Sequence, residues 1–407
     1  MKILMLVPFL PNTQTSGGQT RWYNIVKFLS EEHEITLISL IKDESEKRFI
    51  PELEKYCKKV MVFNRPKSPW TFRNIFLSIF SPFPLLLIRN FSFKERIAVK
   101  KELENGDYDL IHAEAFYVMP HIPKTEIPSI QVEQTIWHRV YEHHVKHEVS
   151  FLLRPFFMID VLKLKFWEIY FWKKATKLFT VSPDDKIIME QLIPGEEIEV
   201  IPNGVDVSYY TEKTIDKHSP PRIMYGVTNF EWMQNREAAD LLTKEVWPII
   251  KRKVKNVNLW IVGRMIPEAI KKLSRENSDI LITENIPDAR DAYLGAYVMV
   301  APIKGSGGTR LKVLEAMAAG LPIVSTSTGV AGLGIEDGVH ALISDTMEGL
   351  ADETVRLIQD KKLADKIGKA GQKFVRDNYD WKAIVDMHDQ IYKKAIEKGK
   401  KTNDRQQ

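Results

Sequence analysis

The segment Lys304–Thr326, KGSGGTRLKVLEAMAAGLPIVST, decides the fold class of this chain. It opens with a loop of small residues, and an apolar-periodic helix is predicted over 311–319, with Thr309 as its cap. Gly320 ends this helix, and a strand begins at Ile323. A glycine loop that opens a helix turns bare N–H groups and the positive helix end toward one point, which suits a phosphate group.

Charged side chains are concentrated at the same point. Arg310 and Lys312 add two cations to the start of the helix, and Glu315 lies one turn further on. A solvated amphipathic helix is the alternative interpretation of these three residues. The glycine loop in front of them favours an anion site instead.

The composition is that of an ordinary globular protein with more than one domain. The chain has 407 residues, of which 44% are hydrophobic and 28% charged, and its net charge of +4 is too small to indicate nucleic-acid binding. Its single cysteine, Cys57, excludes a disulfide framework. The N-terminal MKILMLVPFLP is interpreted as a buried strand, and no run reaches the roughly 18 uncharged apolar residues of a membrane helix. We therefore expect a cytoplasmic protein.

Apolar runs typical of strands alternate with helical patterns along the whole chain, which indicates parallel α/β sheets. The strands are predicted at 3–7, 35–40, 60–63, 109–112, 129–132 and 178–181, and then at 222–226, 259–262, 280–283, 298–301 and 323–325.

This pattern predicts two doubly wound domains. The N-terminal domain is expected over residues 1–183, with the strand at 178–181 as its last, and the C-terminal domain over 184–380. A final helix over 381–398 and a disordered tail over 399–407 complete the chain. Ligand loops are expected at the carboxyl ends of the strands, where Gly17 and Gly18 follow the first strand of the N-terminal domain.

The ordered motifs carry a family resemblance. The array SGGQTR, TVSPDDK, VIPNGVD, VGR, PDARDAYLGAYVMVAPI and GSGGTRLKVLEAMAAGLPIVST resembles the retaining glycosyltransferases of family 4, also called glycosyl transferases group 1, and in particular a bacterial subgroup with a GTRLK loop. The resemblance covers nearly the whole chain. It implies the GT-B fold: two facing Rossmann-like domains, the N-terminal one binding the acceptor and the C-terminal one the nucleotide sugar. It also implies a C-terminal helix that crosses back to the N-terminal domain.

The resemblance also implies roles for individual residues. Glu315 is expected to hold the ribose hydroxyls of a nucleotide sugar. Arg310 and Lys312 are expected to bind its diphosphate and to act as the catalytic residues, because they stabilise the charge of the leaving group. The remaining donor-binding residues implied by the family are Gly17, Gly18, Gly263, Arg264, Pro287, Gly308 and Thr309.

Three positions depart from the family pattern. Gly307 stands where a glutamate often contacts the transferred sugar. In the first loop of the C-terminal domain, VTNFEWMQNRE, Asn235 is the usable substrate-binding residue. On the acceptor side Glu114 takes the place of a frequent histidine, with His112 two residues earlier, and Glu133 is a further candidate that could equally lie at the surface.

The sequence thus predicts a glycosyltransferase that moves a hexose-type sugar from a nucleotide-diphosphate donor to a hydroxyl of a glycan or lipid-linked acceptor. Retention of configuration, no metal ion and no cofactor beyond the sugar nucleotide are implied by the resemblance. The alternatives are a non-catalytic nucleotide-sugar-binding scaffold and a GT-B sugar-nucleotide epimerase. A nucleic-acid partner is not expected.

Two basic, apolar stretches suggest a further partner. Residues 65–96 carry six Lys or Arg against Glu95 alone, and residues 151–179 carry six against Asp160 and Glu168. Aromatic residues interleaved with cations are typical of surfaces that contact anionic membranes. Packing of these helices on the N-terminal sheet is the competing interpretation, and peripheral contact with the inner membrane face is the functional one.

Overall fold

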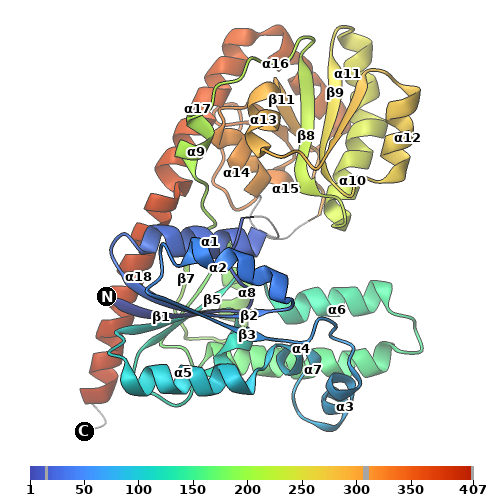
Figure 1. Cartoon of the computed structure of the whole chain (residues 1–407). Coiled ribbons are helices and arrows are strands. Elements are labelled where there is room, and N and C mark those ends of the chain that lie inside the picture. Colours follow the sequence, from blue (N-terminus) through green and yellow to red (C-terminus); the bar gives the residue numbers. More distant parts are fainter. Residues whose placement is uncertain (14–16, 306–310, 405–407) are drawn as a thin grey trace. The chain divides into compact units, whose positions relative to one another are not determined.

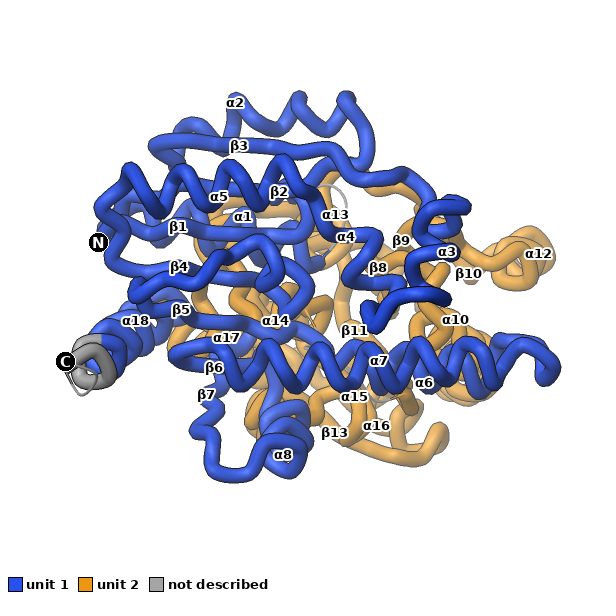
Figure 2. Tube along the Cα trace, turned by 90° about the horizontal axis from the view of Figure 1, so that it is seen from below, with its two compact units in different colours: residues 1–202, 384–407 blue, residues 203–383 orange. Residues whose placement is uncertain are grey.

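The structure is a computed structural model that describes residues 1–13, 17–305 and 311–404. The chain divides into two compact units (Figure 2). Unit 1 takes in Met1–Pro202 and the chain from Ile384 onward, and unit 2 takes in Asn203–Ala383. Each unit is an α/β domain built on one parallel sheet (Figure 1).

The sheet of unit 1 has seven strands in the order β3-β2-β1-β4-β5-β6-β7, and all neighbours are parallel. Strands such as β1, KILMLV, are nearly continuous apolar runs, because helices cover both faces of a parallel sheet. The strand order reverses between β1 and β4. The strands are β1 (Lys2–Val7), β2 (Glu34–Ile41), β3 (Lys59–Asn64), β4 (Leu110–Glu114), β5 (Ser129–Glu133), β6 (Lys177–Thr180) and β7 (Ile198–Val200).

The helices of unit 1 lie on both faces of this sheet. In Figure 1, α1 lies on one side of it, and α5 and α7 lie on the other. The helices are α1 (Gly17–Leu29), η1 (Glu44–Phe49), α2 (Ile50–Leu53), α3 (Phe72–Phe80), α4 (Leu85–Asn90), α5 (Phe93–Asn105), η2 (Phe116–His121), α6 (Trp137–Glu148), α7 (Arg154–Trp172) and α8 (Pro183–Leu192).

The sheet of unit 2 has six parallel strands in the order β10-β9-β8-β11-β12-β13. Its order reverses between β8 and β11. The strands are β8 (Arg222–Asn229), β9 (Asn258–Arg264), β10 (Ile280–Glu284), β11 (Val298–Ala301), β12 (Ile323–Ser325) and β13 (Leu342–Ile343). The helices are α9 (Val207–Thr211), α10 (Met233–Leu241), η3 (Leu242–Val246), α11 (Trp247–Lys253), α12 (Glu268–Glu276), α13 (Ala289–Gly295), α14 (Leu311–Ala318), α15 (Ser327–Val330), α16 (Met347–Gln359) and α17 (Lys361–Tyr379).

Two features differ from the sequence expectations. The strand β7 pairs with β6, so β6 is not the last strand of the first sheet, and unit 1 extends to Pro202 rather than ending near residue 183. This edge strand has three residues, of which Ile198 alone is buried, so it carries no apolar run to detect. The helix α18 (Trp381–Asp404) continues past Lys398, where disorder was expected, because adding turns to an established helix needs no new nucleation.

The final helix returns to unit 1, which confirms the expected crossing. Its Tyr392 and His388 are fully buried, and the Tyr392 hydroxyl lies 2.6 Å from Nδ1 of His112 on β4. The rings of His388 and Phe179, on β6, meet edge to face with centroids 5.5 Å apart. Buried polar and aromatic contacts therefore fix the end of the chain on this sheet.

A buried carboxyl group lies on α5 of the same unit. Glu95 has no exposed surface, and its nearest titratable partner is Nε2 of His121, at 3.4 Å. That nitrogen accepts a hydrogen bond from the Ser92 N–H, and Nδ1 lies 3.0 Å from the Val118 carbonyl oxygen, which assigns a neutral ring. Burial raises the pKa of Glu95 to about 8 and lowers the pKa of His121 to about 4. The pair is therefore neutral at pH 7.

We expect Glu95→Gln to raise the free energy of unfolding at pH 8 by roughly 2–4 kcal/mol, since a pKa that differs by one between the folded and unfolded chain corresponds to about 1.4 kcal/mol. The folded-state pKa lies above the ordinary value of 4.5, so the contribution of Glu95 to stability is fully present below pH 4.5 and is lost as the pH rises to about 8. Urea unfolding at pH 5 and pH 8 measures this, with Glu104→Gln as the exposed control on the same helix. An equal change at both pH values would contradict the assignment.

Candidate functional site

The reversal of strand order in unit 2 marks where a ligand should bind. β8 and β11 are neighbours, β8 leads into α10, and β11 leads toward α14. In open α/β sheets, ligands bind outside the carboxyl ends of the strands at such a reversal. The start of α10 and the start of α14 therefore define the candidate donor site.

Lys312 on α14 forms hydrogen bonds with side chains of β8 and of α10. Its Nζ donates hydrogen bonds to Oδ1 of Asn235 and, at 3.2 Å, to the hydroxyl of Tyr225. The Asn235 amide nitrogen donates in turn to Oγ1 of Thr228 and to the carbonyl of Asn229, both at 2.8 Å. The structure thus brings together two of the predicted substrate-binding residues, which lie 77 positions apart in sequence.

Glu315 lies one turn further along α14, and its carboxyl group accepts a hydrogen bond from Tyr293. The buried Tyr293 of α13 donates a hydrogen bond from its hydroxyl to Oε2 of Glu315 at 2.8 Å. Burial raises the pKa of Glu315 to about 7, although the bond from Tyr293 and the charge of Lys312 act in the opposite direction. This carboxyl group is therefore poised to change charge near neutral pH.

Four predicted residues of the glycine loop, Gly307, Gly308, Thr309 and Arg310, lie outside the described residues. Their roles stay predictions. Gly305, just before them, packs against α10: a Cβ atom added there would come within 2.6 Å of Cγ of Gln234. The chain entering the glycine loop therefore passes close to the start of α10.

Three further residues that the family resemblance assigns to the donor lie at the end of β9 and after β10: Gly263, Arg264 and Pro287. Gly263 is buried within β9, where an added Cβ would lie 2.3 Å from the Thr228 carbonyl oxygen, so the close approach of two strands explains this glycine. Arg264 and Pro287 are exposed. The contact of these residues with a nucleotide-sugar donor stays a prediction.

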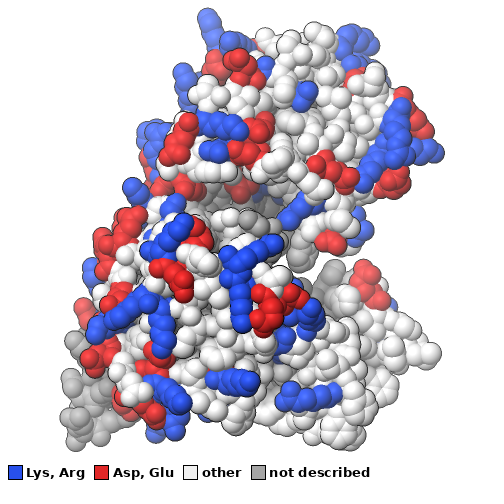
Figure 3. Space-filling model, viewed as in Figure 1, with Lys and Arg blue, Asp and Glu red and all other residues white. Residues whose placement is uncertain are grey.

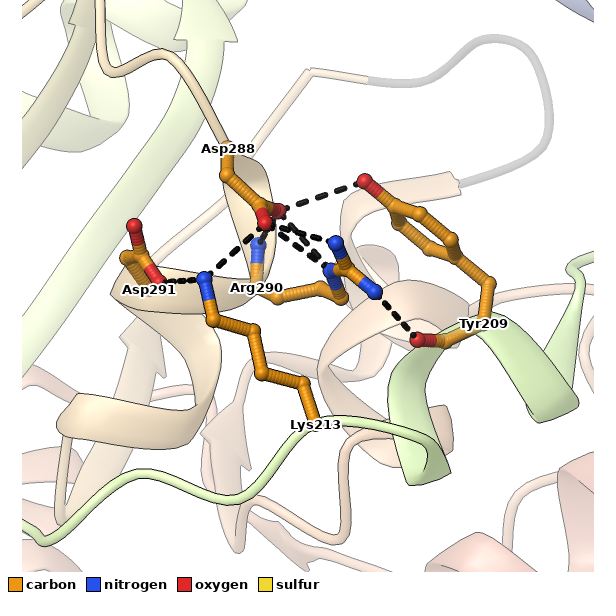
Figure 4. Close-up of polar contacts among 5 residues, drawn as sticks. All are labelled: Tyr209, Lys213, Asp288, Arg290 and Asp291. Carbon is orange, nitrogen blue, oxygen red and sulfur yellow. Dashed lines mark hydrogen bonds and ion pairs between the residues drawn. The ribbon is translucent and has the colours of Figure 1, made fainter.

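A charged cluster that sequence reasoning missed fixes the loop after β10 (Figure 4). Arg290 forms a bidentate salt bridge with Asp288, with Nε 3.0 Å from Oδ1 and Nη2 2.8 Å from Oδ2. The guanidinium of Arg290 also lies over the ring of Tyr209, 4.0 Å from its centroid. Lys213 Nζ lies 3.0 Å from Asp288 Oδ2 and also binds Asp291. The cluster joins α9 to the start of α13 and so holds the segment that contains Pro287. Tyr209 and Lys213 lie 79 and 75 positions from Asp288 along the chain, and no spacing in the sequence signals the pairing.

The strand reversal of unit 1 lies between β1 and β4. The helix α1, which follows β1, begins at Gly17, and a Cβ atom added at Gly18 would lie 3.3 Å from Oε1 of Gln134. The Gln134 amide in turn donates to Oε2 of Glu114, the last residue of β4, at 3.2 Å. Three loops at this carboxyl edge are thus in contact.

The three residues predicted on the acceptor side have no exposed surface. His112 Nε2 lies 3.0 Å from Oε1 of Glu114, and although burial favours the neutral acid, the bond from His112 holds the pKa of Glu114 below its ordinary value. Glu133 accepts hydrogen bonds from Gln131 and Trp172, and burial raises its pKa well above the ordinary value. In this structure these three groups form hydrogen bonds with other side chains of unit 1. Their role in binding an acceptor stays a prediction.

Unit 1 also carries an apolar surface, which we call the α3–α7 face: the exposed side chains Phe72, Phe76 and Phe80 of α3 with Phe156 and Phe166 of α7. Asp160 of α7 ties the two helices, because it accepts a hydrogen bond from Ser78 of α3 at 2.8 Å. The part of unit 1 around α3 and α7 is largely uncharged in Figure 3, with Lys and Arg side chains scattered over it. Among the described helices, none has the length and apolar character needed to cross a bilayer.

Two parallel α/β units, each with loops gathered at a strand reversal, define a protein of the GT-B class. Residues 15–209 match the family model Glycosyltransferase Family 4, and residues 221–360 match Glycosyl transferases group 1. The chain is therefore a glycosyltransferase of the group 1, family 4 type, as its motifs predicted.

The relatives agree with this assignment. Over 399 residues the chain is 22% identical to an uncharacterized 44.6 kDa protein in the cps region of Klebsiella pneumoniae, with 94% of this chain and 97% of the relative covered. It is 26% identical over 211 residues to the GDP-mannose-dependent alpha-(1-6)-phosphatidylinositol monomannoside mannosyltransferase of Mycolicibacterium smegmatis, which covers 46% of this chain and 54% of that protein.

Solved structures confirm the fold. Anabaena HepE, crystallised in complex with UDP and glucose, matches with a TM-score of 0.61 and 16% identity over 96% of this chain and 99% of HepE. At this identity the likeness shows the fold alone.

Proposed function

We propose that this glycosyltransferase moves a hexose-type sugar from a nucleotide-diphosphate donor to a hydroxyl group of a glycan or lipid-linked glycan. The observation that carries the proposal is the pairing of Lys312 with Asn235 at the strand reversal of unit 2, with Glu315 one turn further on. A cation, an amide and a carboxyl group at one strand edge match a diphosphate and a ribose.

The proposed chemistry is transfer with retention and without a metal ion. Cleavage of the glycosyl–phosphate bond leaves negative charge on the diphosphate. Lys312, together with Arg310 and the N–H groups that open α14, would stabilise that charge in the transition state. The leaving phosphate would take the proton of the acceptor hydroxyl, so no separate general base is assigned. Turnover in the presence of EDTA and the anomeric configuration of the product, read by NMR, test the two claims.

The donor is the first point to determine. The Mycolicibacterium smegmatis relative is GDP-mannose-dependent, and the structural neighbour was solved with UDP and glucose. GDP- and UDP-sugars are therefore the first donors to test. A donor present at 100 times its dissociation constant adds about 2.7 kcal/mol to the stability of the folded chain. Among UDP-, GDP-, ADP- and dTDP-sugars, we expect one class to raise the melting temperature of the chain. The same class should be consumed when a cell extract supplies the acceptor. Binding without turnover, equal in the native chain and in Arg310→Ala, would instead indicate a non-catalytic scaffold.

We also propose that the α3–α7 face contacts an anionic membrane surface at the cytoplasmic side, where lipid-linked acceptors are reached. Phe72 is 86% exposed and Phe156 71% exposed, and Lys165 stands among the apolar residues of α7. Such surfaces combine apolar burial with electrostatic attraction. Cosedimentation with phosphatidylglycerol vesicles at low salt is expected, and its absence would contradict this part of the proposal.

A further inference from the structure

Unit 1 carries a large cavity, partly open to solvent, at the edge of its sheet where β5 and β6 begin. Its volume is about 1120 Å³, and Ser129 and Thr176, at the starts of these strands, line it. The lining helices α4, α5 and α7 lie on the side of the sheet that faces the viewer in Figure 2. Glu114 and Glu133 end their strands at the opposite edge, and a strand of five residues spans about 16 Å. Ser129 and Thr176 therefore lie at the opposite edge of the sheet from the candidate acceptor residues.

The inner wall of the cavity is apolar. Leu87 of α4, Met119 of η2 and Phe171 of α7 line it and are buried in the fold. Ile122 and Trp167 extend this wall outward. The volume exceeds the roughly 300–1,000 Å³ of sites for drug-sized molecules, so the cavity has room for a long hydrocarbon chain.

The rim of the cavity is cationic. Glu126 and Glu196 are the acidic residues that line it. The basic lining residues outnumber them: Arg73, Arg96, Lys124, Lys173, Lys174 and Lys398. Lys124, Lys173 and Lys174 are exposed. An apolar interior under a positive rim matches an amphiphile with an anionic head.

The cavity is bordered by the same two helices that carry the α3–α7 face. Leu77 of α3 and Tyr170 of α7 line the cavity and belong to the same two helices as that face. The helices are held together at this point: Lys163 Nζ donates to the carbonyls of Ser78 and Ser81 at 2.6 and 2.8 Å, and Trp167 Nε1 donates to Pro82 at 2.9 Å. A chain leaving a membrane under the α3–α7 face would meet the cavity beside these two helices.

We infer that this cavity binds one hydrocarbon chain of an anionic phospholipid, whose phosphate is held by the lysines of the rim. The lipid would be an anchor rather than the sugar acceptor, because Lys173 and Lys174 precede β6, at the edge of the sheet opposite Glu114 and Glu133. Lys173 and Lys174 would bind the phosphate, and Leu87, Met119 and Phe171 would contact the chain. The inference rests on the proposed membrane contact, since a lipid must first be within reach.

Photo-crosslinking distinguishes a lipid inside the cavity from a lipid on the surface. The full chain is incubated with vesicles of phosphatidylcholine and phosphatidylglycerol in which the phosphatidylglycerol carries a diazirine on one acyl chain, and labelled peptides are mapped by mass spectrometry. Labels are expected on the peptides that contain Leu87, Met119 and Ala175, the last of which also lines the cavity. Labels confined to Phe72, Phe156 and their neighbours would overturn the inference and leave membrane adsorption intact.

Variants make the test quantitative. Ala175→Phe, or Ile122→Trp should the first variant fold poorly, is expected to abolish labelling of the cavity while vesicle binding persists. Lys173→Glu with Lys174→Glu is expected to weaken vesicle binding about thirtyfold or more, because each cation near an anionic surface contributes about fivefold. The matched control is Lys361→Glu with Lys362→Glu, an exposed pair on α17 with the same change in charge. Equal losses in both double variants would overturn the role of the rim, and donor binding, measured in parallel, reports separately on the proposed function.

Discussion

Lys312→Met is expected to lower kcat for sugar transfer by roughly 10²–10³-fold, the usual cost of removing one preorganised group that stabilises developing charge. Lys312 is fixed by Asn235 and the Tyr225 hydroxyl, so its charge is held in place before the donor binds. Because negative charge on the diphosphate grows as the glycosyl bond breaks, kcat should fall more than donor affinity. Steady-state kinetics together with donor titration of the inactive variant separate the two effects.

The control for this experiment is Lys366→Met, which removes an exposed lysine from α17 of the same unit. It should leave kcat and donor affinity unchanged. Turnover of Lys312→Met within a few-fold of the native chain would exclude Lys312 from the catalytic site. A loss confined to affinity would assign it to uniform binding of the donor.

Glu315→Gln is expected to have opposite effects on donor binding and on stability. A hydrogen bond from a ribose hydroxyl to a charged carboxylate contributes about 1.5–3 kcal/mol to donor binding. The Glu315→Gln variant should therefore bind the donor roughly 10–100-fold more weakly at pH 8. The free chain should become more stable at pH 8, since burial raises the pKa of Glu315 to about 7 and an ionised carboxyl group in that position costs free energy.

The pH dependence gives the sharper test of Glu315. In the native chain the ionised form is present above about pH 7, so donor affinity should be full at pH 8 and decline as the pH falls through 7 toward 6. The variant should lose this dependence. Calorimetric titration at several pH values measures it, with the exposed Glu336→Gln as control. An unchanged pH profile in Glu315→Gln would contradict the ribose assignment.

The sequence by itself determined the class of fold, and it placed Lys312, Glu315 and Asn235 near one strand edge of unit 2. Alternating apolar runs and helical periods report the local burial of each element, and this is enough to recognise parallel α/β domains. Lys312 and Glu315 lie three positions apart on one helix, so their neighbourhood follows from helix geometry. Asn235 could be named because the family resemblance assigns a substrate-binding residue to the segment after β8, and the carboxyl ends of parallel strands share one edge.

Only the tertiary structure decided which distant side chains meet. His112 and Glu114 read as acceptor residues along the chain, yet they are buried, with Tyr392 of the final helix bonded to His112 across 280 positions. The short edge strand β7 and the cluster of Arg290, Asp288 and Tyr209 were likewise absent from the sequence pattern. Periodicity reports what lies next to a residue along its own element, whereas strand order and long-range packing choose its partners. For this reason the neighbourhood of Lys312, Glu315 and Asn235 could be predicted, but the burial of the acceptor-side residues could not.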